Sequence, residues 1–224
     1  MVLCSYPTQI PGTASPGSYA GATNSIFLIN QIQQGDDIFN RIGRKINIKS
    51  LTLKINVFPS ANQWMVNPVA APNELLSTTV RVMIVFDSQI NNVTSISLKD
   101  VLRVQDTNTY ATMGQSSGAY IDASPNLDNR DRFTIISDKW FNVGNVSAGP
   151  GAGVLKIYKK FKKSGLPIIY SGNTGISIST GGIWVIVGGN NGDVPGTTPS
   201  NNDGASVGVN FLYTMTTRLR YTDA

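Results

Sequence analysis

The chain has 224 residues, of which 41% are hydrophobic and 14% are charged, and it carries a formal net charge of +5. This length is enough to bury a substantial core in one large all-β domain or two small ones, and the charged fraction lies well below the roughly 25% of ordinary soluble domains. The chain has no histidine, which excludes a Ser-His-Asp triad and most catalytic metal sites. Its lone cysteine, Cys4, excludes a disulfide framework. We therefore expect a protein that is not an enzyme, that uses no cofactor or metal site, and whose charge-poor surface is largely covered by other protein. A calcium site built from loop aspartates stays open, but nothing in their spacing requires one.

The first 34 residues are predicted to form an extended arm. Met1 to Asn24 is rich in Pro, Gly, Ser and Thr, and the short apolar run from Ser25 to Ile32 is typical of a strand or of a segment lying against a neighbour. A polar turn follows from Gln33 to Asp37. We expect residues 1–34 to pack on a neighbour as an arm and residues 35–224 to form a single domain.

The stretch from Arg41 to Pro59, RIGRKINIKSLTLKINVFP, combines a strand pattern with positive charge. Its second half alternates large apolar residues with polar ones, which is the period of a half-buried strand. The apolar positions are Leu51, Leu53, Ile55 and Val57. Its first half is basic, and no acidic residue occurs anywhere in the stretch. We expect the strand to end at Pro59, because proline cannot donate a hydrogen bond to a ladder.

The middle of the chain predicts two strands and one helix. Thr78 to Asp87 has apolar residues on both faces and therefore predicts a central strand. Ser97 to Gln105 has apolar residues at helical spacing, with Ser97 as a possible cap, and predicts one short helix. Thr107 to Asn129 is a long polar excursion, and Arg132 to Asn142 predicts the second strand.

The last third of the chain predicts the remaining strands. Val154 to Lys163, VLKIYKKFKK, alternates in a way that directs Tyr158 outward and Phe161 inward. Gly181 and Gly182 form a hairpin signal, and the strand that follows is apolar on both faces. Ser206 to Tyr221 is the longest alternation in the chain and predicts a strand held between two neighbours.

These elements favour an all-β fold. No helical pattern separates consecutive strands, so a parallel sheet with crossover helices is disfavoured. The strand count, the long loops, and a first and a last strand that could pair centrally fit an eight-stranded jelly-roll β-sandwich with one short helix.

Two basic clusters are the candidate site for binding a polyanion. The first consists of Arg41, Arg44, Lys45 and Lys49, and the second of Lys156, Tyr158, Lys159, Lys160, Lys162 and Lys163. Cations neutralise phosphates and an exposed aromatic ring stacks on unpaired bases, so this composition is typical of a nucleic-acid surface. Arg218 and Arg220 would extend that surface if the last strand pairs with the first. The alternative is a solvated strand edge whose lysines discourage aggregation.

The order of six segments carries a family resemblance. The segments are DDIFNRIGRKINIKSLTLKINV, TVRVMIVFD, RFTIISDKWFNV, KIYKKFKKSG, IWVIV and VNFLYTMTTRLRYTD. This order resembles that of the capsid proteins of small circular Rep-encoding single-stranded DNA viruses, the group of circoviruses, geminiviruses and nanoviruses. The basic strand of that group resembles R-x-G-x-K-x-x-I-K-S, which is matched here from Arg41 to Ser50.

The resemblance implies a subunit that self-assembles into a small icosahedral shell, T=1-like, around circular single-stranded DNA. It implies contact with further copies of the chain, with the genome and with an unidentified host receptor, and a location in the virion and, during assembly, in the host nucleus. No apolar run reaches the ~20 residues that a membrane span requires, so we expect no membrane insertion. The family's long arginine-rich arm has no counterpart in residues 1–40, which contain no basic residue. Either such an arm has been removed from this sequence, or the inner wall of the shell supplies the charge.

Two other functions stay open from the sequence. A jelly-roll carbohydrate-binding module would use the polar loops at Thr107 to Asn129 and Gly188 to Gly204. A coat protein of a small RNA virus would use the same basic clusters. Paired carboxylates occur at Asp36 with Asp37 and at Asp128 with Asp131, but a turn and a solvated loop explain them better than a glycosidase pair does.

Overall fold

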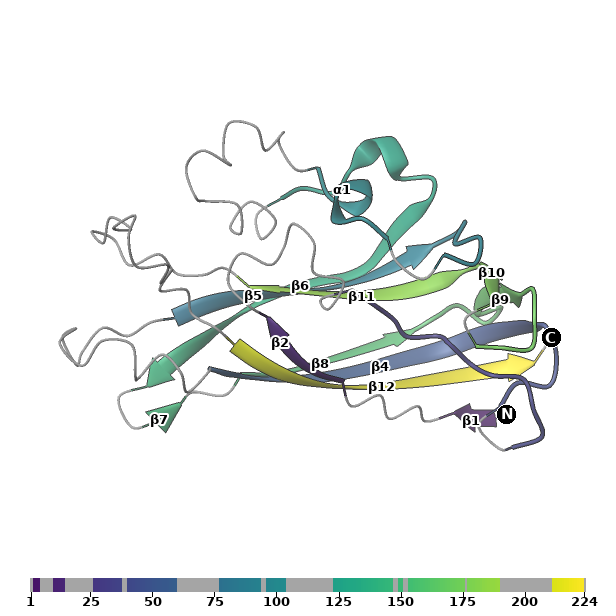
Figure 1. The fold of residues 1–224 in the computed structure, drawn as a ribbon, viewed down its shortest axis with the longest axis horizontal. Coiled ribbons are helices and arrows are strands. Elements are labelled where there is room, and N and C mark those ends of the chain that lie inside the picture. The colour runs from purple at the N-terminus through teal and green to yellow at the C-terminus, as the bar shows by residue number, and fades with distance from the viewer. Residues whose placement is uncertain are drawn as a thin grey trace.

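The computed structural model describes residues 2–4, 10–14, 26–37, 40–59, 77–93, 96–103, 123–146, 149–150, 153–175, 177–189 and 211–223. Over these residues the chain forms two antiparallel β-sheets, layered one on the other, and one short α-helix (Figure 1). For the described residues, the prediction of an all-β fold with one short helix is confirmed.

Seven strands form sheet 1 and five form sheet 2. Sheet 1 consists of β1 (Val2–Cys4), β2 (Ile10–Ala14), β4 (Lys45–Pro59), β8 (Gly153–Lys160), β9 (Leu166–Tyr170), β10 (Ile178–Thr180) and β12 (Phe211–Asp223). Sheet 2 consists of β3 (Ile26–Leu28), β5 (Ser77–Asp87), β6 (Phe133–Val146), β7 (Gly149–Pro150) and β11 (Gly182–Gly189). The helix α1 (Leu98–Val101) and a 3₁₀ turn, η6 (Leu127–Asn129), lie between β5 and β6 in the sequence.

The long strands pair from the outside of the sequence inward, the first with the last and the second with the second-last. β4 is antiparallel to β12 along its whole length, and β5 is antiparallel to β11. The other edge of β12 pairs with β1 and β2, so the last strand lies between neighbours, as predicted. β3 pairs with β11. Residues of the predicted arm, 1–34, therefore contribute strands to both sheets of the sandwich.

The core lies between the two sheets and follows the predicted alternation of β4. Leu51, Leu53 and Ile55 have no exposed surface, and Tyr213 of β12 is buried beside them on the same side of sheet 1. The ring of Phe27, from β3 in sheet 2, meets Tyr213 edge to face, with ring centres 6.2 Å apart. Burial of each such aliphatic side chain contributes about 1.5–3 kcal/mol.

A β-bulge at Lys49 interrupts the alternation of β4, which the sequence pattern did not predict. Ser50 pairs with Arg220 and Ile48 pairs with Tyr221, so Lys49 is an extra residue in β4 with no partner on β12. Core-facing side chains therefore occupy positions 46 and 48 before the bulge and positions 51, 53, 55 and 57 after it.

The strand on the other side of β4 is interrupted at the same level. β8 ends at Lys160, and β9 begins at Leu166 after a turn. Lys49 bridges this interruption, because its Nζ donates to the carbonyl oxygens of Lys163 (2.8 Å) and Ser164 (3.2 Å). The pairing of β4 is thus interrupted on both sides at Lys49. On one side the register with β12 shifts, and on the other side β8 gives way to β9.

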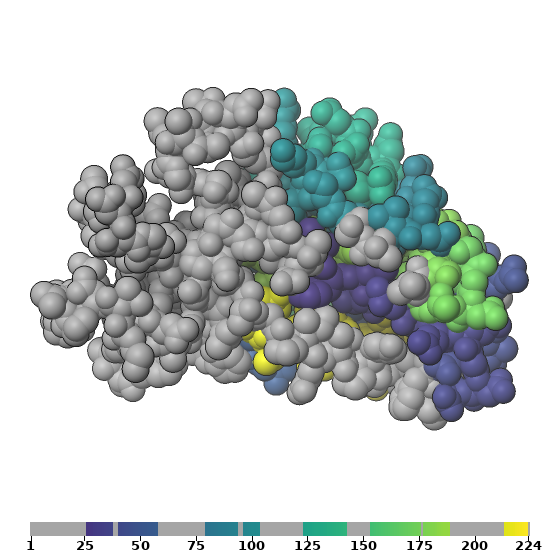
Figure 2. Space-filling model, viewed as in Figure 1, coloured from purple at the N-terminus to yellow at the C-terminus, as the bar shows by residue number. Residues whose placement is uncertain are grey.

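Part of the outer face of sheet 2 is covered by the chain itself, whereas Trp140 of β6 on the same face is 49% exposed. Both faces of β5 are buried from Val80 to Val85, which confirms the predicted central strand. The covering segment consists of residues 88–93, 96–103 and 123–132, whose buried apolar side chains include Ile90 and Leu98. It lies over sheet 2 in the ribbon and forms the teal upper part of the space-filling view (Figures 1 and 2). Arg81 fastens it by donating to the carbonyl oxygen of Ala123 at 2.8 Å.

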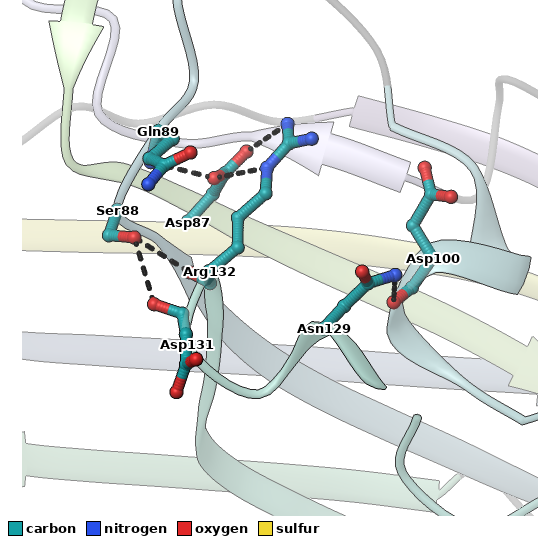
Figure 3. Close-up of polar contacts among 7 residues, drawn as sticks. All are labelled: Asp87, Ser88, Gln89, Asp100, Asn129, Asp131 and Arg132. Atoms are coloured by element: carbon teal, nitrogen blue, oxygen red, sulfur yellow. Dashed lines mark hydrogen bonds and ion pairs between the residues drawn. The ribbon is translucent and has the colours of Figure 1, made fainter. Parts of the chain in front are cut away.

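Polar contacts also fix the covering segment at the ends of β5 and β6 (Figure 3). Asp87 is fully buried and accepts from Arg132 at 2.9 Å (Nε) and 3.0 Å (Nη2). Donating to the Asp87 carboxylate raises the pKa of the Arg132 guanidinium above its ordinary value. Ser88 Oγ donates to the carbonyl oxygen of Arg132, and Asn129 donates to that of Asp100 at 3.0 Å.

The predicted helix forms but is shorter than expected. α1 ends at Val101, and Ser97 occupies the N-cap position without a side-chain cap hydrogen bond. Leu102 is extended and forms a bridge with Pro125, which draws the chain out of the helix. The residues predicted to continue the helix to Gln105 lie outside the described residues from 104 onward.

The hairpin predicted at Gly181 and Gly182 does not form. β10 pairs with β9 in sheet 1, whereas β11 pairs with β5 and β3 in sheet 2. Gly181 has a φ of +86°, and a Cβ there would lie 2.7 Å from the carbonyl oxygen of Pro167, so glycine is required. The glycine pair therefore makes a corner between the sheets instead of a turn within one sheet.

A buried asparagine supports this corner and gives the first prediction. Asn30 has no exposed surface, and its side chain donates to the carbonyl oxygen of Gly181 and accepts from the N–H of Ile183, both at 2.9 Å. Replacement Asn30→Ala leaves both groups without this partner, and we expect the free energy of unfolding to fall by about 2–3 kcal/mol in urea titrations. Asn173→Ala, at an exposed turn residue, is the control and should change it by less than about 0.5 kcal/mol. Equal stability of the two variants would contradict this role for Asn30.

Candidate nucleic-acid interface

Charge is distributed unequally between the two sheets. The strands of sheet 1 contain eight basic residues and one acidic residue, Asp223. The basic residues are Lys45, Lys49, Lys54, Lys156, Lys159, Lys160, Arg218 and Arg220. The strands of sheet 2 contain two basic and two acidic residues, which are Arg81, Lys139, Asp87 and Asp138. The excess positive charge of the sandwich is therefore concentrated on sheet 1.

The bulge in β4 brings the basic residues of that strand to one side. Ile48 before the bulge and Leu51 after it both point into the core. Lys45, Lys49 and Lys54 therefore all lie on the opposite, outer face of sheet 1, where Lys45 and Lys54 are exposed. Without the extra residue, Lys45 and Lys49 would share the side of Leu51 and point toward the core.

The register adds the basic residues of β8 and β12 to the same face. Lys54 pairs with Lys156 of β8, and Ser50 lies between Lys160 of β8 and Arg220 of β12. Residues paired across antiparallel strands point to the same side of a sheet. We define the basic face as the outer surface of sheet 1 formed by Lys45, Lys49, Thr52, Lys54, Lys156, Tyr158, Lys160, Arg218 and Arg220.

The acidic residue of sheet 1 lies away from the basic face. Asp223 pairs with Ile46, which points into the core. Its carboxylate accepts from the backbone N–H groups of Ile42 (3.2 Å) and Gly43 (3.3 Å) beyond the end of β4. The cations of the basic face are therefore not neutralised by a carboxylate from the described strands of this sheet.

The cations on this face repel one another. Lys54 and Lys156 are directly opposite on neighbouring strands, and like charges in that arrangement destabilise a sheet. Lys160 and Arg220 flank Ser50 from its two sides. A bound polyanion would remove this repulsion, so the face is suited electrostatically to phosphate groups.

Tyr158 provides an aromatic surface within the basic face. Its side chain is 57% exposed, and Lys156 and Lys160 are its neighbours on the same side of β8. Phe161 packs against the core instead. The predicted division between an outward Tyr158 and an inward Phe161 is confirmed. The face thus offers both charge for a phosphate backbone and a ring for a base.

Arg41 does not belong to this surface, although the sequence placed it in the first basic cluster. It has no exposed surface, and its guanidinium donates to the carbonyl oxygens of Ile32 (3.1 Å), Gly43 (2.6 Å) and Gly172. It also lies 4.0 Å from the centre of the Tyr170 ring. Burial lowers the pKa of the Arg41 guanidinium from its ordinary value. The structure gives Arg41 a role in holding three chain segments together, which argues against contact with a polyanion.

The other predicted site residues lie around the basic face. Lys159 pairs with Leu51 and so is directed to the core side of β8, where it is partly buried at the edge of the sheet. Lys162 and Lys163 are exposed in the turn that follows β8. Arg44 is exposed at the leading end of β4. Five of the ten predicted residues therefore lie on the face itself, namely Lys45, Lys49, Lys156, Tyr158 and Lys160.

Three cations of the basic face were not among the predicted site residues. Lys54 alternates with buried Leu53 and Ile55, and this alternation already indicated that it points outward. Arg218 and Arg220 depended on the pairing of β12, which the structure provides through β4. The sequence contained the signal for Lys54, whereas the two arginines required the strand order.

Acidic side chains do not form a second site among the described residues. Asp87 faces Arg132, whereas the carboxylates of Asp100 and Asp131 point away from it (Figure 3). Asp36 and Asp37 are exposed in a turn, where Asp37 accepts from the side chain of Asn40. In the described part of the chain, no group of three or more Asp, Glu, His or Cys residues is positioned to hold a metal ion.

Neither a protein-family model nor a curated protein sequence matches this chain. Among the described residues, no helix has the length and apolar character needed to cross a bilayer. The function is therefore inferred from the charge, register and exposure of the basic face.

The role of Arg41 gives the second prediction. Replacement Arg41→Lys keeps the positive charge but cannot reach the same set of carbonyl oxygens, so we expect the free energy of unfolding to fall by about 2–4 kcal/mol in denaturant titrations. Arg44→Lys, at an exposed neighbour, should change it by less than about 0.5 kcal/mol. If Arg41→Lys were as stable as the unmodified chain, the contribution of Arg41 to stability would come from its charge and not from the geometry of its hydrogen bonds.

Proposed function

We propose that this chain is the coat protein of a small virus with a single-stranded DNA genome. Copies of the chain assemble into a small icosahedral shell, T=1-like, with the basic face directed inward onto the genome. The observation that carries the proposal is the gathering of cations and Tyr158 on one exposed sheet face, while the outer face of the other sheet is partly covered by the chain itself. Such a two-sided subunit suits a shell, because its inner and outer surfaces meet different partners.

The strand order supports a jelly-roll type of sandwich. A jelly roll arises when a long antiparallel hairpin folds into two sheets, so that its first strand pairs with its last and its second with its second-last. The pairs β4–β12 and β5–β11 follow that rule. The next inner pair differs, because β6 pairs with β5, and β8 pairs with β4. We infer a variant of the jelly roll in which β4 and β5 have neighbours on both sides.

The composition supports assembly from copies of the same chain. Only 14% of residues are charged, and a surface that is poor in charge is suited to burial against other protein. The basic face provides the complementary feature, a patch that stays available for a polyanion. The preference for DNA over RNA follows from the family resemblance of the six segments, and enzymatic digestion separates the two.

Electron microscopy of the purified chain tests the proposal. We expect closed particles of uniform size whose co-purified nucleic acid is degraded by DNase, and not by RNase, after the particles are opened. Nucleic acid that only RNase degrades would indicate an RNA virus coat protein. A chain that remains monomeric at high concentration and carries no nucleic acid would reject the proposal, and glycan binding by that monomer would favour the carbohydrate-binding alternative.

The basic face gives a sharper prediction through a matched pair of variants. Changing Lys54, Lys156, Lys160 and Arg220 to Gln should lower the nucleic acid retained per subunit. It should also reduce the slope of log affinity against log salt by about 3, since each phosphate contact on a single strand contributes about 0.7. The control changes four exposed cations outside sheet 1 to Gln, namely Lys99, Arg103, Arg130 and Lys139, and alters the net charge equally. Filter-binding titrations over a range of NaCl concentrations measure both slopes. Equal losses in the two variants would show that net charge, and not this face, holds the nucleic acid.

A further inference from the structure

A row of three paired residues crosses β4 on the basic face, and we refer to this row as the slot. Thr52 pairs with Tyr158 of β8 on one side and with Arg218 of β12 on the other. The three residues therefore form one row across three strands and point to the same side. Thr52 is short, while Tyr158 and Arg218 are long and exposed. The row thus places a short side chain between two long ones that end in planar groups, one aromatic and one guanidinium.

The dimensions of the slot fit one nucleic-acid base. Neighbouring strands lie about 4.8 Å apart, so the backbones that carry Tyr158 and Arg218 are separated by roughly 10 Å. A base stacked between two planar groups needs about 7 Å from plane to plane, twice the ~3.4 Å repeat of stacked bases. Side chains stand roughly perpendicular to a sheet. A small lean of the Tyr158 and Arg218 side chains toward Thr52 would reduce the separation from roughly 10 Å to the ~7 Å that a stacked base needs.

The cations around the slot lie where phosphates on either side of the base would be. Lys156 and Lys160 are two residues before and after Tyr158 on β8, which places each about 6.6 Å away along the strand. Lys54 and Arg220 hold the corresponding positions beside Thr52 and Arg218. The slot is therefore surrounded by positive charge, and it adds two planar groups, the Tyr158 ring and the Arg218 guanidinium, between those cations.

We propose that Tyr158 and Arg218 hold one unpaired base between them above Thr52, while Lys54, Lys156, Lys160 and Arg220 neutralise the adjoining phosphates. This inference rests on the proposed function and specifies the ligand of the same surface as a single strand. Aromatic rings and guanidinium groups stack on every base, so the slot tolerates any sequence. A duplex does not fit, because its bases are already stacked on one another and present no free face to the two planar groups.

The test compares two oligonucleotides of equal charge on the full-length chain freed of nucleic acid. One is a single-stranded DNA 12-mer, and the other is a 12-mer of abasic deoxyribose phosphate. The unmodified chain should bind the first more tightly by about 5- to 100-fold, the range that stacking of one base produces. Tyr158→Leu should remove most of this preference without changing the salt slope, because no charge is lost. Tyr158→Phe should retain the preference, since the ring is kept.

The outcomes separate the slot from the proposed function. Equal binding of the two oligonucleotides by the unmodified chain, or an unchanged preference in Tyr158→Leu, overturns the slot and leaves the basic face as a phosphate-binding surface. Failure of both oligonucleotides to bind at low salt overturns the slot and the proposed function together. Loss of the preference in Tyr158→Leu, with retention in Tyr158→Phe, supports the slot.

Discussion

The antiparallel ladder between β4 and β12 is the constraint on which the rest of the structure depends. It joins the first long strand to the last and fixes the register of every residue on the basic face. Its inner side supplies fully buried residues such as Leu53 and Met215 to the core. Its outer side carries Lys54 and Arg218. One set of backbone hydrogen bonds therefore positions both the apolar residues that stabilise the fold and the cations that we propose bind nucleic acid.

The bulge at Lys49 reconciles two requirements that conflict in an unbroken strand. Lys45 and Lys49 have odd residue numbers, like the buried residues 51, 53, 55 and 57 that follow them in β4. Strict alternation would therefore direct both lysines toward the core. Because β4 contains one extra residue, they lie instead on the side of Lys54. The same lysine then binds the turn after β8 through its ammonium group. A single inserted residue thus unites the charge of the strand on one face.

The two sheets solve the problem of an exposed apolar face in different ways. Sheet 2 has buried apolar residues on both sides of β5, and the covering segment buries part of its outer face, held by the hydrogen bond from Arg81 to Ala123 and the ion pair between Asp87 and Arg132. Sheet 1 places polar and basic side chains on its outer face and needs no cover. In the proposed shell this difference would assign sheet 1 to the genome. Mutual repulsion among its cations disfavours leaving that face without an anion.

Much of the fold was present in the sequence as local periodicity. Alternation along β4, β5 and β12 predicted their existence and their buried sides, because a strand has a period of two and no tertiary information is required. The outward position of Tyr158 followed from the same rule. The hairpin at Gly181 was a wrong prediction, because a glycine pair gives the chain freedom to turn but does not determine the sheet in which the next strand pairs.

The sequence by itself determined the all-β class, the core side of the long strands and the presence of concentrated positive charge, since each depends on residues close together in the chain. Only the tertiary structure decided which cations act together. Arg41 entered the core because the carbonyl group of Gly172, 131 residues away, converges on it together with those of Ile32 and Gly43. Arg218 and Tyr158 lie on either side of Thr52 because β4 pairs with both β8 and β12, each more than a hundred residues later in the chain. Register between distant strands is a property of the folded chain, so no local pattern could have specified it.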